Sequence, residues 1–222
     1  DAALWIRWCK PCAQYHRGPP PKQAELNPFP ASSPFEVLSV DITGPHPRSR
    51  DGNEYILTAV DVFSKWAEAI PIRAHTAVIV AKRLVDHVFS KFGVPLRLLS
   101  DQGPEFESEL MAELCRTHGI EKIRTTSYKP STNGVCERFH RTLNSMLGKV
   151  VSESQRDWDR HVGPVMAAYR ATVHKSTGYT PNFLVLGREN RAPVDLVLAV
   201  GDDEPTGVGA STDEYVQELL DR

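Results

Sequence analysis

The order of strand-like and helix-like segments in these 222 residues predicts an α/β fold, a mixed five-stranded sheet flanked by helices. Two observations support this prediction. Three strand-like runs with short connections come first, and they indicate an antiparallel meander. The segments that follow alternate between helical and strand-like patterns, which adds two strands and packs helices on the sheet.

The meander comes from three runs between residues 35 and 72. The run 35–42 is mostly apolar, so we expect a central strand that ends at Thr43-Gly44-Pro45. Asp51-Gly52 is a tight-turn signal. The run 54–63, rich in Tyr, Ile, Leu, Thr and Val, supplies the second strand, and 66–72 supplies the third.

The later segments differ in the period of their apolar residues. Helical periodicity predicts helices, and the short apolar runs between them predict strands. In chain order we expect a helix over 76–92, a strand over 96–100, a helix over 106–118, a strand over 122–126, and helices over 133–151 and 158–172. Gly93, Gly119 and the segment 178–181 are helix stops.

Composition divides the chain into a core and its flanking segments. Residues 19–34 hold six prolines and predict an extended linker, because proline fixes φ and lacks an N–H donor. We assign 35–190 to the core and 191–222 to a C-terminal extension. The sequence has no apolar run of membrane-spanning length and no secretory leader pattern. It begins at Asp1 rather than Met, so we expect further sequence upstream.

The charge distribution both argues against and supports a nucleic-acid partner. The formal net charge is −2, and nucleic-acid enzymes are usually more basic. The local field at one face is what attracts phosphate, however. Residues 121–149 hold Glu121 and Glu137 against six basic residues: Lys122, Arg124, Lys129, Arg138, Arg141 and Lys149. A solvated helix face is the alternative interpretation of this window.

Three carboxylates lie where a shared cleft is expected. Asp41 lies near the end of the first strand and Asp101 at the end of a later one, and strand ends present side chains to a common cleft. Glu137 lies in the first turns of the long helix. We expect its apolar stripe to be Val135, Phe139, Leu143, Met146 and Val150. That stripe places Glu137 on the opposite side, with Arg141, Asn144 and Gly148.

Three acidic groups in one cleft require a cation, because like charges raise one another's pKa. Mg²⁺ prefers oxygen ligands and suits phosphate substrates, and two such ions can clamp the attacking and leaving oxygens of a phosphoryl transfer. Taken singly, a strand-end Asp is often a turn former and a helix Glu is often only exposed. The hypothesis of a catalytic role therefore depends on Asp41, Asp101 and Glu137 together.

Four motifs resemble the retroviral and retrotransposon integrase family, most closely its gypsy/Ty3-like branch. They are Val40-Asp41-Ile42-Thr43-Gly44-Pro45, Leu99-Ser100-Asp101-Gln102-Gly103-Pro104-Glu105-Phe106, Tyr128-Lys129-Pro130 through Asn133-Gly134-Val135-Cys136-Glu137-Arg138, and His174 to Pro181 with Leu186-Gly187-Arg188. Thirty-five residues separate Asp101 from Glu137, which is the family's spacing. Cys136 departs from the Thr or Val common before the glutamate.

The resemblance implies an RNase H-like fold and two Mg²⁺ or Mn²⁺ ions. Asp41 would be shared by both ions, Asp101 would complete one site and Glu137 the other. The expected reactions are trimming of the element's 3′ ends and joining of those ends to target DNA. The expected location is nuclear, or a virus-like particle or the cytoplasm as a polyprotein, with DNA and a homo-oligomer as partners and no membrane. Candidate DNA contacts are Lys129, Asn133, Arg138 and Arg141.

The pair Cys9 and Cys12 resembles the second half of the family's His-His-Cys-Cys zinc domain. Only eight residues precede Cys9, so the two histidines would have to lie further upstream. We therefore interpret residues 1–18 as a truncated zinc-domain remnant, with Zn²⁺ bound only in a longer chain.

Three other functions remain open. One is a host-adopted relative that binds DNA without catalysis, which the three carboxylates argue against. The second is an RNase H or another nuclease of the same fold, and the third is a zinc-finger interaction module. Two further acids have open roles. Asp61 would make a structural hydrogen bond or tune the metals, and Glu105 would contact DNA or start a helix.

Overall fold

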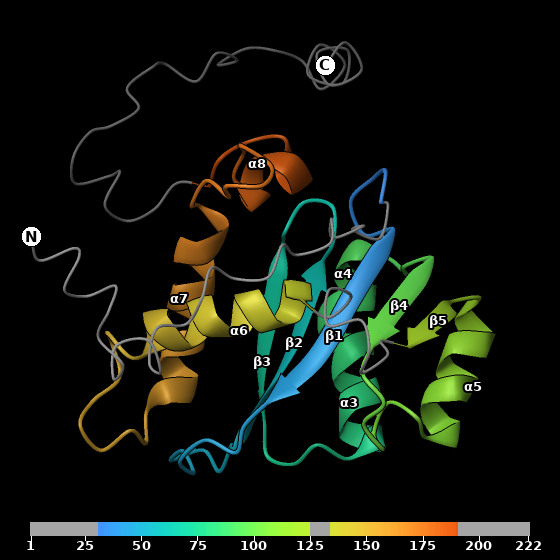
Figure 1. The fold of residues 1–222 in the computed structure, drawn as a ribbon. Coiled ribbons are helices and arrows are strands. Elements are labelled where there is room, and N and C mark those ends of the chain that lie inside the picture. The colour runs from blue at the N-terminus through green and yellow to red at the C-terminus, as the bar shows by residue number, and fades with distance from the viewer. Residues whose placement is uncertain (1–30, 125–133, 191–222) are drawn as a thin grey trace, which may run out of the picture.

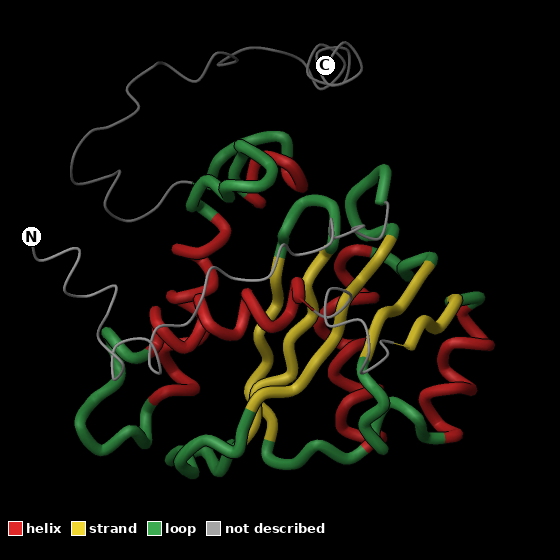
Figure 2. Tube along the Cα trace, in the orientation of Figure 1, coloured by secondary structure: helices red, strands yellow, loops and turns green. Residues whose placement is uncertain are grey.

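A single mixed sheet organises the computed structural model, which describes residues 31–124 and 134–190 (Figure 1). Its strand order is β3-β2-β1-β4-β5, and Figure 2 shows the strands in yellow. The strands are β1 (Val37–Thr43), β2 (Tyr55–Asp61), β3 (Ala67–Ile72), β4 (Arg97–Ser100) and β5 (Glu121–Arg124). β1 pairs antiparallel with β2 and parallel with β4, so the predicted mixed five-stranded sheet is confirmed.

The helices follow the predicted order with shifted boundaries. They are α3 (Ala77–Leu84), the π-helix η1 (Val85–Phe89), α4 (Ser90–Phe92), α5 (Glu109–His118), α6 (Gly134–Leu147), α7 (Trp158–Arg170) and α8 (Pro181–Leu186). The helix predicted over 76–92 is the run α3–η1–α4, with a π-helical turn inside it. α5 begins three residues later than predicted, because the Ser108 side chain accepts a hydrogen bond from the Met111 N–H and caps the helix.

Helix α8 was not predicted. The segment 178–181 was interpreted only as a stop, yet it also starts a new helix. Thr180 is the N-cap and accepts a hydrogen bond from the Phe183 N–H, while Pro181 occupies the first turn. Gly187 ends the helix in the left-handed conformation, with φ 69°.

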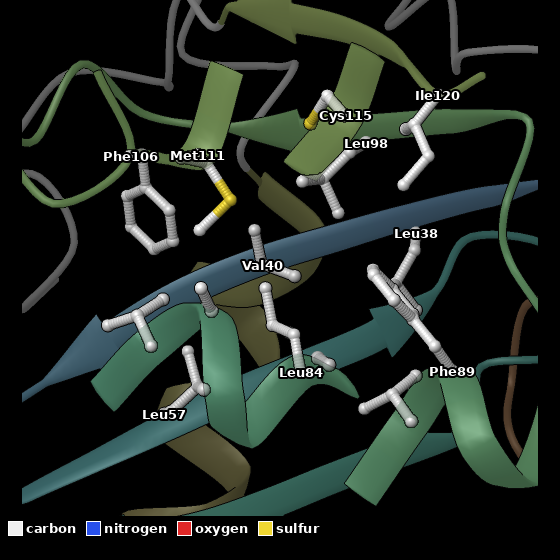
Figure 3. Packing of buried hydrophobic residues seen from close by; sticks show 14 of the residues in the cluster. Leu38, Val40, Leu57, Leu84, Phe89, Leu98, Phe106, Met111, Cys115 and Ile120 are labelled. Carbon is white, nitrogen blue, oxygen red and sulfur yellow. The ribbon is translucent and has the colours of Figure 1, made fainter. Parts of the chain in front are cut away.

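One face of the sheet carries the larger core (Figure 3). Leu38 and Val40 of β1 point to this face and pack against α3, η1 and α5. Leu84, Phe89 and Met111 come from those helices, and Leu84 and Met111 are fully buried. Because side chains alternate along a strand, Ser39 and Asp41 point to the opposite face.

Helices α6 and α7 cover that opposite face. Phe139 and Leu143 of α6 form a second core with Ile56 and Val60 of β2 and with residues of α7. At the end of α7, the Arg170 guanidinium lies 4.7 Å from the centroid of the Trp66 ring. Asp41 of β1 therefore points toward the face of the sheet that α6 covers, and Glu137 lies near the start of that helix.

Candidate active site

The parallel pairing of β1 with β4 brings Asp41 and Asp101 together. The last pair of this ladder is Ser39 with Leu99, and Asp41 and Asp101 each follow that pair by two residues along their own strands. Neighbouring strands are about 4.8 Å apart, and paired residues point to the same face. Both aspartates therefore lie at the carboxyl ends of adjacent strands, and both are close enough to the Cys136 thiol of α6 for their charges to raise its pKa.

Backbone N–H groups orient both aspartates. The Ile42 N–H donates to Asp41 Oδ1 at 2.8 Å. The Gly103 N–H donates to Asp101 Oδ1 at 3.0 Å. A Cβ atom at residue 103 would lie 3.1 Å from that oxygen and 2.9 Å from Glu105 Oε1, so the glycine allows this close approach.

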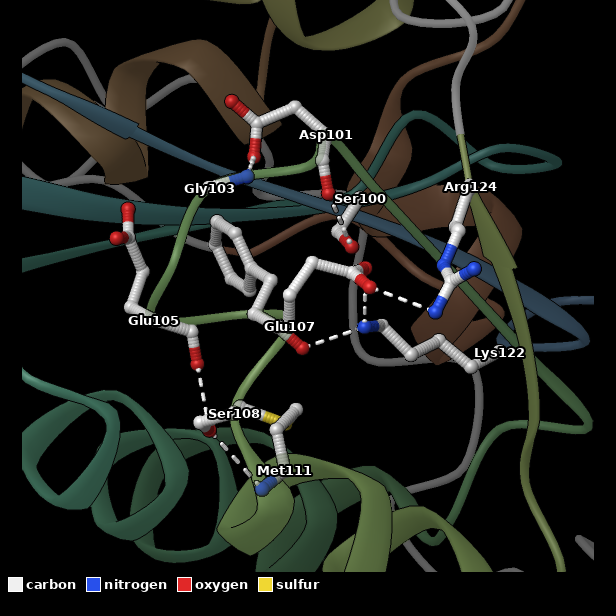
Figure 4. A network of polar contacts seen from close by, with 10 residues as sticks. Ser100, Asp101, Gly103, Glu105, Glu107, Ser108, Met111, Lys122 and Arg124 are labelled. Carbon is white, nitrogen blue, oxygen red and sulfur yellow. Dashed lines mark hydrogen bonds and ion pairs between the residues drawn. The ribbon is translucent and has the colours of Figure 1, made fainter.

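The loop after Asp101 is anchored to β5 by a charged network (Figure 4). Lys122 Nζ lies 2.6 Å from Glu107 Oε1 and also donates to the Phe106 carbonyl. Arg124 forms an ion pair of 2.7 Å with the other Glu107 oxygen. Both cations belong to the basic window found in the sequence, and Glu107 lies outside it. The segment 121–149 is therefore less positive than its six basic residues suggest, because Glu107 neutralises Lys122 and Arg124.

The buried stripe of α6 differs from the predicted one. Val150 is 47% exposed and follows the helix, which ends at Leu147. The buried residues of this helix are Cys136, Phe139, Leu143 and Leu147. At about 100° per residue, Glu137 lies roughly 100° from the centre of this face rather than opposite to it. Glu137 is exposed and borders the packed surface.

Cys136 fixes the start of α6 on β1. Its thiol is fully buried and donates to Ser39 Oγ at 3.1 Å. Burial, with smaller contributions from the charges of Asp41 and Asp101, raises the pKa of Cys136 to about 12. The thiol is thus a neutral packing group close to both aspartates, and the next residue in the helix is Glu137.

His140 was not singled out from the sequence, although it contacts Asp41. Its Nδ1 lies 3.9 Å from Asp41 Oδ2, and its Nε2 lies 2.8 Å from Thr58 Oγ1. Burial, with a smaller contribution from the charge of His46, lowers the pKa of His140 to about 4. The sequence offers one signal for His140, which is its position in α6. It follows the buried Phe139 by one residue and Glu137 by three, which places it at the border of the packed face.

The donor set suits a hard divalent cation, since carboxylate oxygens are the ligands that Mg²⁺ prefers. Asp41 and Asp101 present such oxygens side by side, and Glu137 lies on the helix that packs over them. Within residues 31–124 and 134–190, however, no three His, Cys, Asp or Glu side chains are grouped so as to hold a metal ion. The structure thus places Asp41 and Asp101 at the ends of neighbouring strands, and the described residues contain no closed cluster of three ligands that would include Glu137.

The remaining predicted residues fall into two groups. Arg138 and Arg141 are exposed on α6, whereas Lys129, Asn133, Cys9 and Cys12 lie outside the described residues. The two acids with open roles are now placed. Asp61 is fully buried and accepts hydrogen bonds from the N–H groups of Phe35 and Ser64, so its structural role is confirmed. Glu105 precedes α5 rather than starting it, and lies 3.5 Å from His75 Nδ1.

Known proteins resemble this chain in sequence. Residues 31–130 match the family model described as integrase core domain. The retrovirus-related Pol polyprotein from transposon 412 of Drosophila melanogaster is 33% identical over 72% of this chain and 13% of the polyprotein. The gypsy retrotransposon integrase-like protein 1 of Bos taurus is 26% identical over 98% of this chain and 43% of that protein. This chain thus spans less than half the length of either relative.

A solved structure supports the same fold. The catalytic core domain of HTLV-2 integrase, in complex with magnesium, matches with a TM-score of 0.56 and 19% identity. The match covers 70% of this chain and 99% of that core domain. A likeness at this identity concerns the fold, which is a mixed sheet with flanking helices in both proteins.

Proposed function

Because this chain carries an integrase core domain and so belongs to the retroviral and retrotransposon integrase family, we propose that it is a metal-dependent polynucleotidyl transferase. The core has the RNase H-like fold of that family. The observation that supports the proposal is the parallel β1–β4 register: continued two residues past Ser39 and Leu99, it would set Asp41 opposite Asp101 under the start of α6.

The three carboxylates divide the catalytic work. Asp41 and Asp101 are held by the N–H groups of Ile42 and Gly103, so their second oxygens keep a fixed direction. Glu137 completes the set from α6. Divalent cations bound there supply an activated oxygen nucleophile and neutralise charge on the leaving oxygen. The proposed reactions are trimming of DNA 3′ ends by water, followed by attack of the 3′-hydroxyl on a target phosphodiester.

The exposed side of α6 is the proposed DNA surface. Arg141 and Asn144 are exposed and follow Glu137 at helical spacing, so DNA phosphates along this face would approach the carboxylates. Arg138 lies near Lys65 and His174. Burial lowers the pKa of both groups, and the positive charge of Arg138 contributes to each shift. A phosphate placed among these groups would relieve that repulsion. Such contacts position DNA without reading its sequence.

Assembly, domain division and location are part of the same proposal. The HTLV-2 core was solved in trimeric and dimeric forms, which supports a homo-oligomer for this chain. None of the described helices combines the length and apolar content required to cross a bilayer. We place the catalytic core in residues 35–190 and the zinc-domain remnant in 1–18. The proposed site of action is the nucleus, where target DNA is found.

Strand joining on branched DNA tests the proposal. The substrate mimics the integration product, and the enzyme is assayed with Mg²⁺ or Mn²⁺ against Asp101→Asn and Glu137→Gln. We expect metal-dependent joining by the wild type and a loss on the order of 10²-fold or more in both variants. Asp61→Asn is unsuited as a control, because Asp61 is buried in the core; Asp86→Asn, on η1 and away from the proposed site, is the matched control.

A second candidate is a non-catalytic DNA-binding relative, favoured by the lack of a closed metal cluster in the described residues. A folded wild-type sample that binds DNA and Mn²⁺ but joins no strands with either metal would decide for this candidate.

A further inference from the structure

We propose that His140 is a positioning residue, which holds the Asp41 carboxylate and the water around it in the arrangement that a divalent cation requires. This inference rests on the proposed function, because it takes Asp41 to be a metal ligand. The observation behind it is that Thr58, His140 and Asp41 are linked through two hydrogen bonds and one close approach.

Thr58 fixes which nitrogen of the ring carries a proton. Its hydroxyl donates to the Asp41 carbonyl oxygen at 3.0 Å, and a carbonyl can only accept. The hydroxyl has a single proton. We assign that proton to the bond with the carbonyl, and the hydroxyl then accepts from the His140 Nε2–H group over 2.8 Å. In the neutral ring, Nδ1 then has a lone pair and no proton.

This lone pair faces the Asp41 carboxylate. Nδ1 lies 3.9 Å from Asp41 Oδ2, and this distance is too long for a direct hydrogen bond. With the proton on Nε2, both atoms are also acceptors. A group with two protons, such as water, can donate to both atoms over that distance. Water bound to a cation is a stronger donor than bulk water. His140 would therefore accept a hydrogen bond from the hydration shell of an ion held by Asp41.

The surroundings hold this geometry in place. The side chains of His140 and Asp41 are each only 15% exposed, so few solvent molecules compete for the contact. The Ile42 N–H restrains the other Asp41 oxygen. His140 follows Glu137 by one helical turn, so the docking of α6 positions a proposed ligand and the imidazole together. Groups that orient metal ligands typically change metal affinity by about 10- to 100-fold when removed.

Calorimetric titration of the full chain with Mn²⁺, without DNA, measures the effect directly. We expect His140→Ala and His140→Gln to bind Mn²⁺ about tenfold more weakly or worse. Asn places an amide oxygen near the Nδ1 position and Gln reaches the Nε2 position, so His140→Asn should retain affinity within a few-fold, as an estimate. Thr58→Val should weaken binding and Thr58→Ser should not. The matched control is His118→Ala, at an exposed position of α5.

The outcomes separate this inference from the proposed function. If Asp101→Asn weakens Mn²⁺ binding and His140→Ala does not, the inference is overturned and the metal site stands. If neither variant changes binding, the metal site itself is wrong. Equal losses in His140→Asn and His140→Ala would also overturn the inference, since they would indicate a packing role alone. Thermal unfolding of each variant identifies any loss that comes from misfolding, and the Thr58 pair then gives the deciding comparison.

Discussion

At the scale of single residues, uncharged groups orient the carboxylates of Asp41 and Asp101. Gly103 donates its N–H to Asp101, and Ile42 does the same for Asp41. His140 approaches Asp41 from α6, where Cys136 holds the helix against Ser39. Backbone geometry and one half-buried imidazole therefore surround the two carboxylates.

Gly103→Ala tests the first of these contacts. The added Cβ would lie 2.9 Å from Glu105 Oε1 and 3.1 Å from Asp101 Oδ1, so the Glu105 carboxylate must move and the aspartate must give by a few tenths of an ångström. We expect strand joining to fall on the order of tenfold or more, while the free energy of unfolding changes by about 1 kcal/mol. Gly163→Ala on α7 is the control, because a Cβ there meets no atom within 4 Å. Equal joining by both variants would contradict the close approach.

The buried His140 predicts a specific pH dependence of stability. Burial, and to a lesser extent His46, lowers the folded-state pKa from 6.5 to about 4. Between these values the unfolded chain binds a proton that the folded chain does not, so stability falls as pH falls from 6.5 to 4. The loss is about 3 kcal/mol at most. Urea unfolding across this range should show a difference between wild type and His140→Asn that varies with pH; a constant difference would contradict the burial.

The sequence allowed some of these residues to be predicted and not others. Asp41 and Asp101 could be placed at strand ends, because each follows an apolar run. The spacing of His140 places it one helical turn after Glu137, but its contacts with Asp41 and Thr58, like the contact of Ser39 with Cys136, join different elements and are not encoded in local patterns. The catalytic role of the three carboxylates stays a prediction.

Among the elements, α6 has the largest effect on the site because it carries Glu137 and His140. Its buried residues face β1, β2 and α7, and its start is fixed by Cys136. A small rotation of this helix would move both functional side chains. The buried stripe of α6 therefore also determines where these two proposed functional side chains lie.

Leu143→Ala tests which residues make up that stripe. Leu143 is 1% exposed, so its truncation leaves a cavity and should lower the free energy of unfolding by about 2–5 kcal/mol. Val150 is 47% exposed, and Val150→Ala should change it by less than about 0.5 kcal/mol. Chemical denaturation of the two variants gives the comparison. Similar losses would restore the stripe predicted from the sequence.

The order and type of the helices and strands were largely predictable from the sequence, whereas their first and last residues were not. All five strands and the four longer helical segments follow from apolar periodicity and from Gly and Pro stops. The π-helical turn η1 leaves no signal in that pattern. Helix α8 could have been found from Thr180 as N-cap and Gly187 as C-cap. The stripe of α6 was displaced because Cys136 and Leu147 were not counted among its apolar residues.

The whole molecule has a net charge of −2, so DNA binding must come from a local field. Glu107 neutralises Lys122 and Arg124 next to the Asp101 loop. Arg138 and Arg141 are exposed cations on α6, the helix that carries Glu137. The position of Asp101 relative to Asp41 and α6 results from the pairing of β1 with β4, which are more than fifty residues apart in the sequence. A short segment of sequence cannot reveal such a pairing.

Salt dependence of DNA binding tests the α6 surface. Each phosphate contact contributes about 0.9 to the slope of log K against log salt concentration. Arg141→Gln should therefore reduce that slope by about 0.9 and weaken binding to all DNA sequences alike. Arg116→Gln on α5 is the matched control, because Arg116 is an exposed arginine paired with Glu113. An unchanged slope in Arg141→Gln would place the DNA elsewhere.

The central claim is that Asp41, Asp101 and Glu137 together hold the catalytic metal ions. Anomalous diffraction from crystals of the chain soaked in Mn²⁺ tests it most directly. The account predicts Mn²⁺ peaks within about 2–2.5 Å of oxygens of Asp41 and Asp101, with Glu137 drawn in as a ligand, and their loss in Asp101→Asn. Mn²⁺ peaks confined to other residues, with these three carboxylates bare at saturating metal, would contradict it.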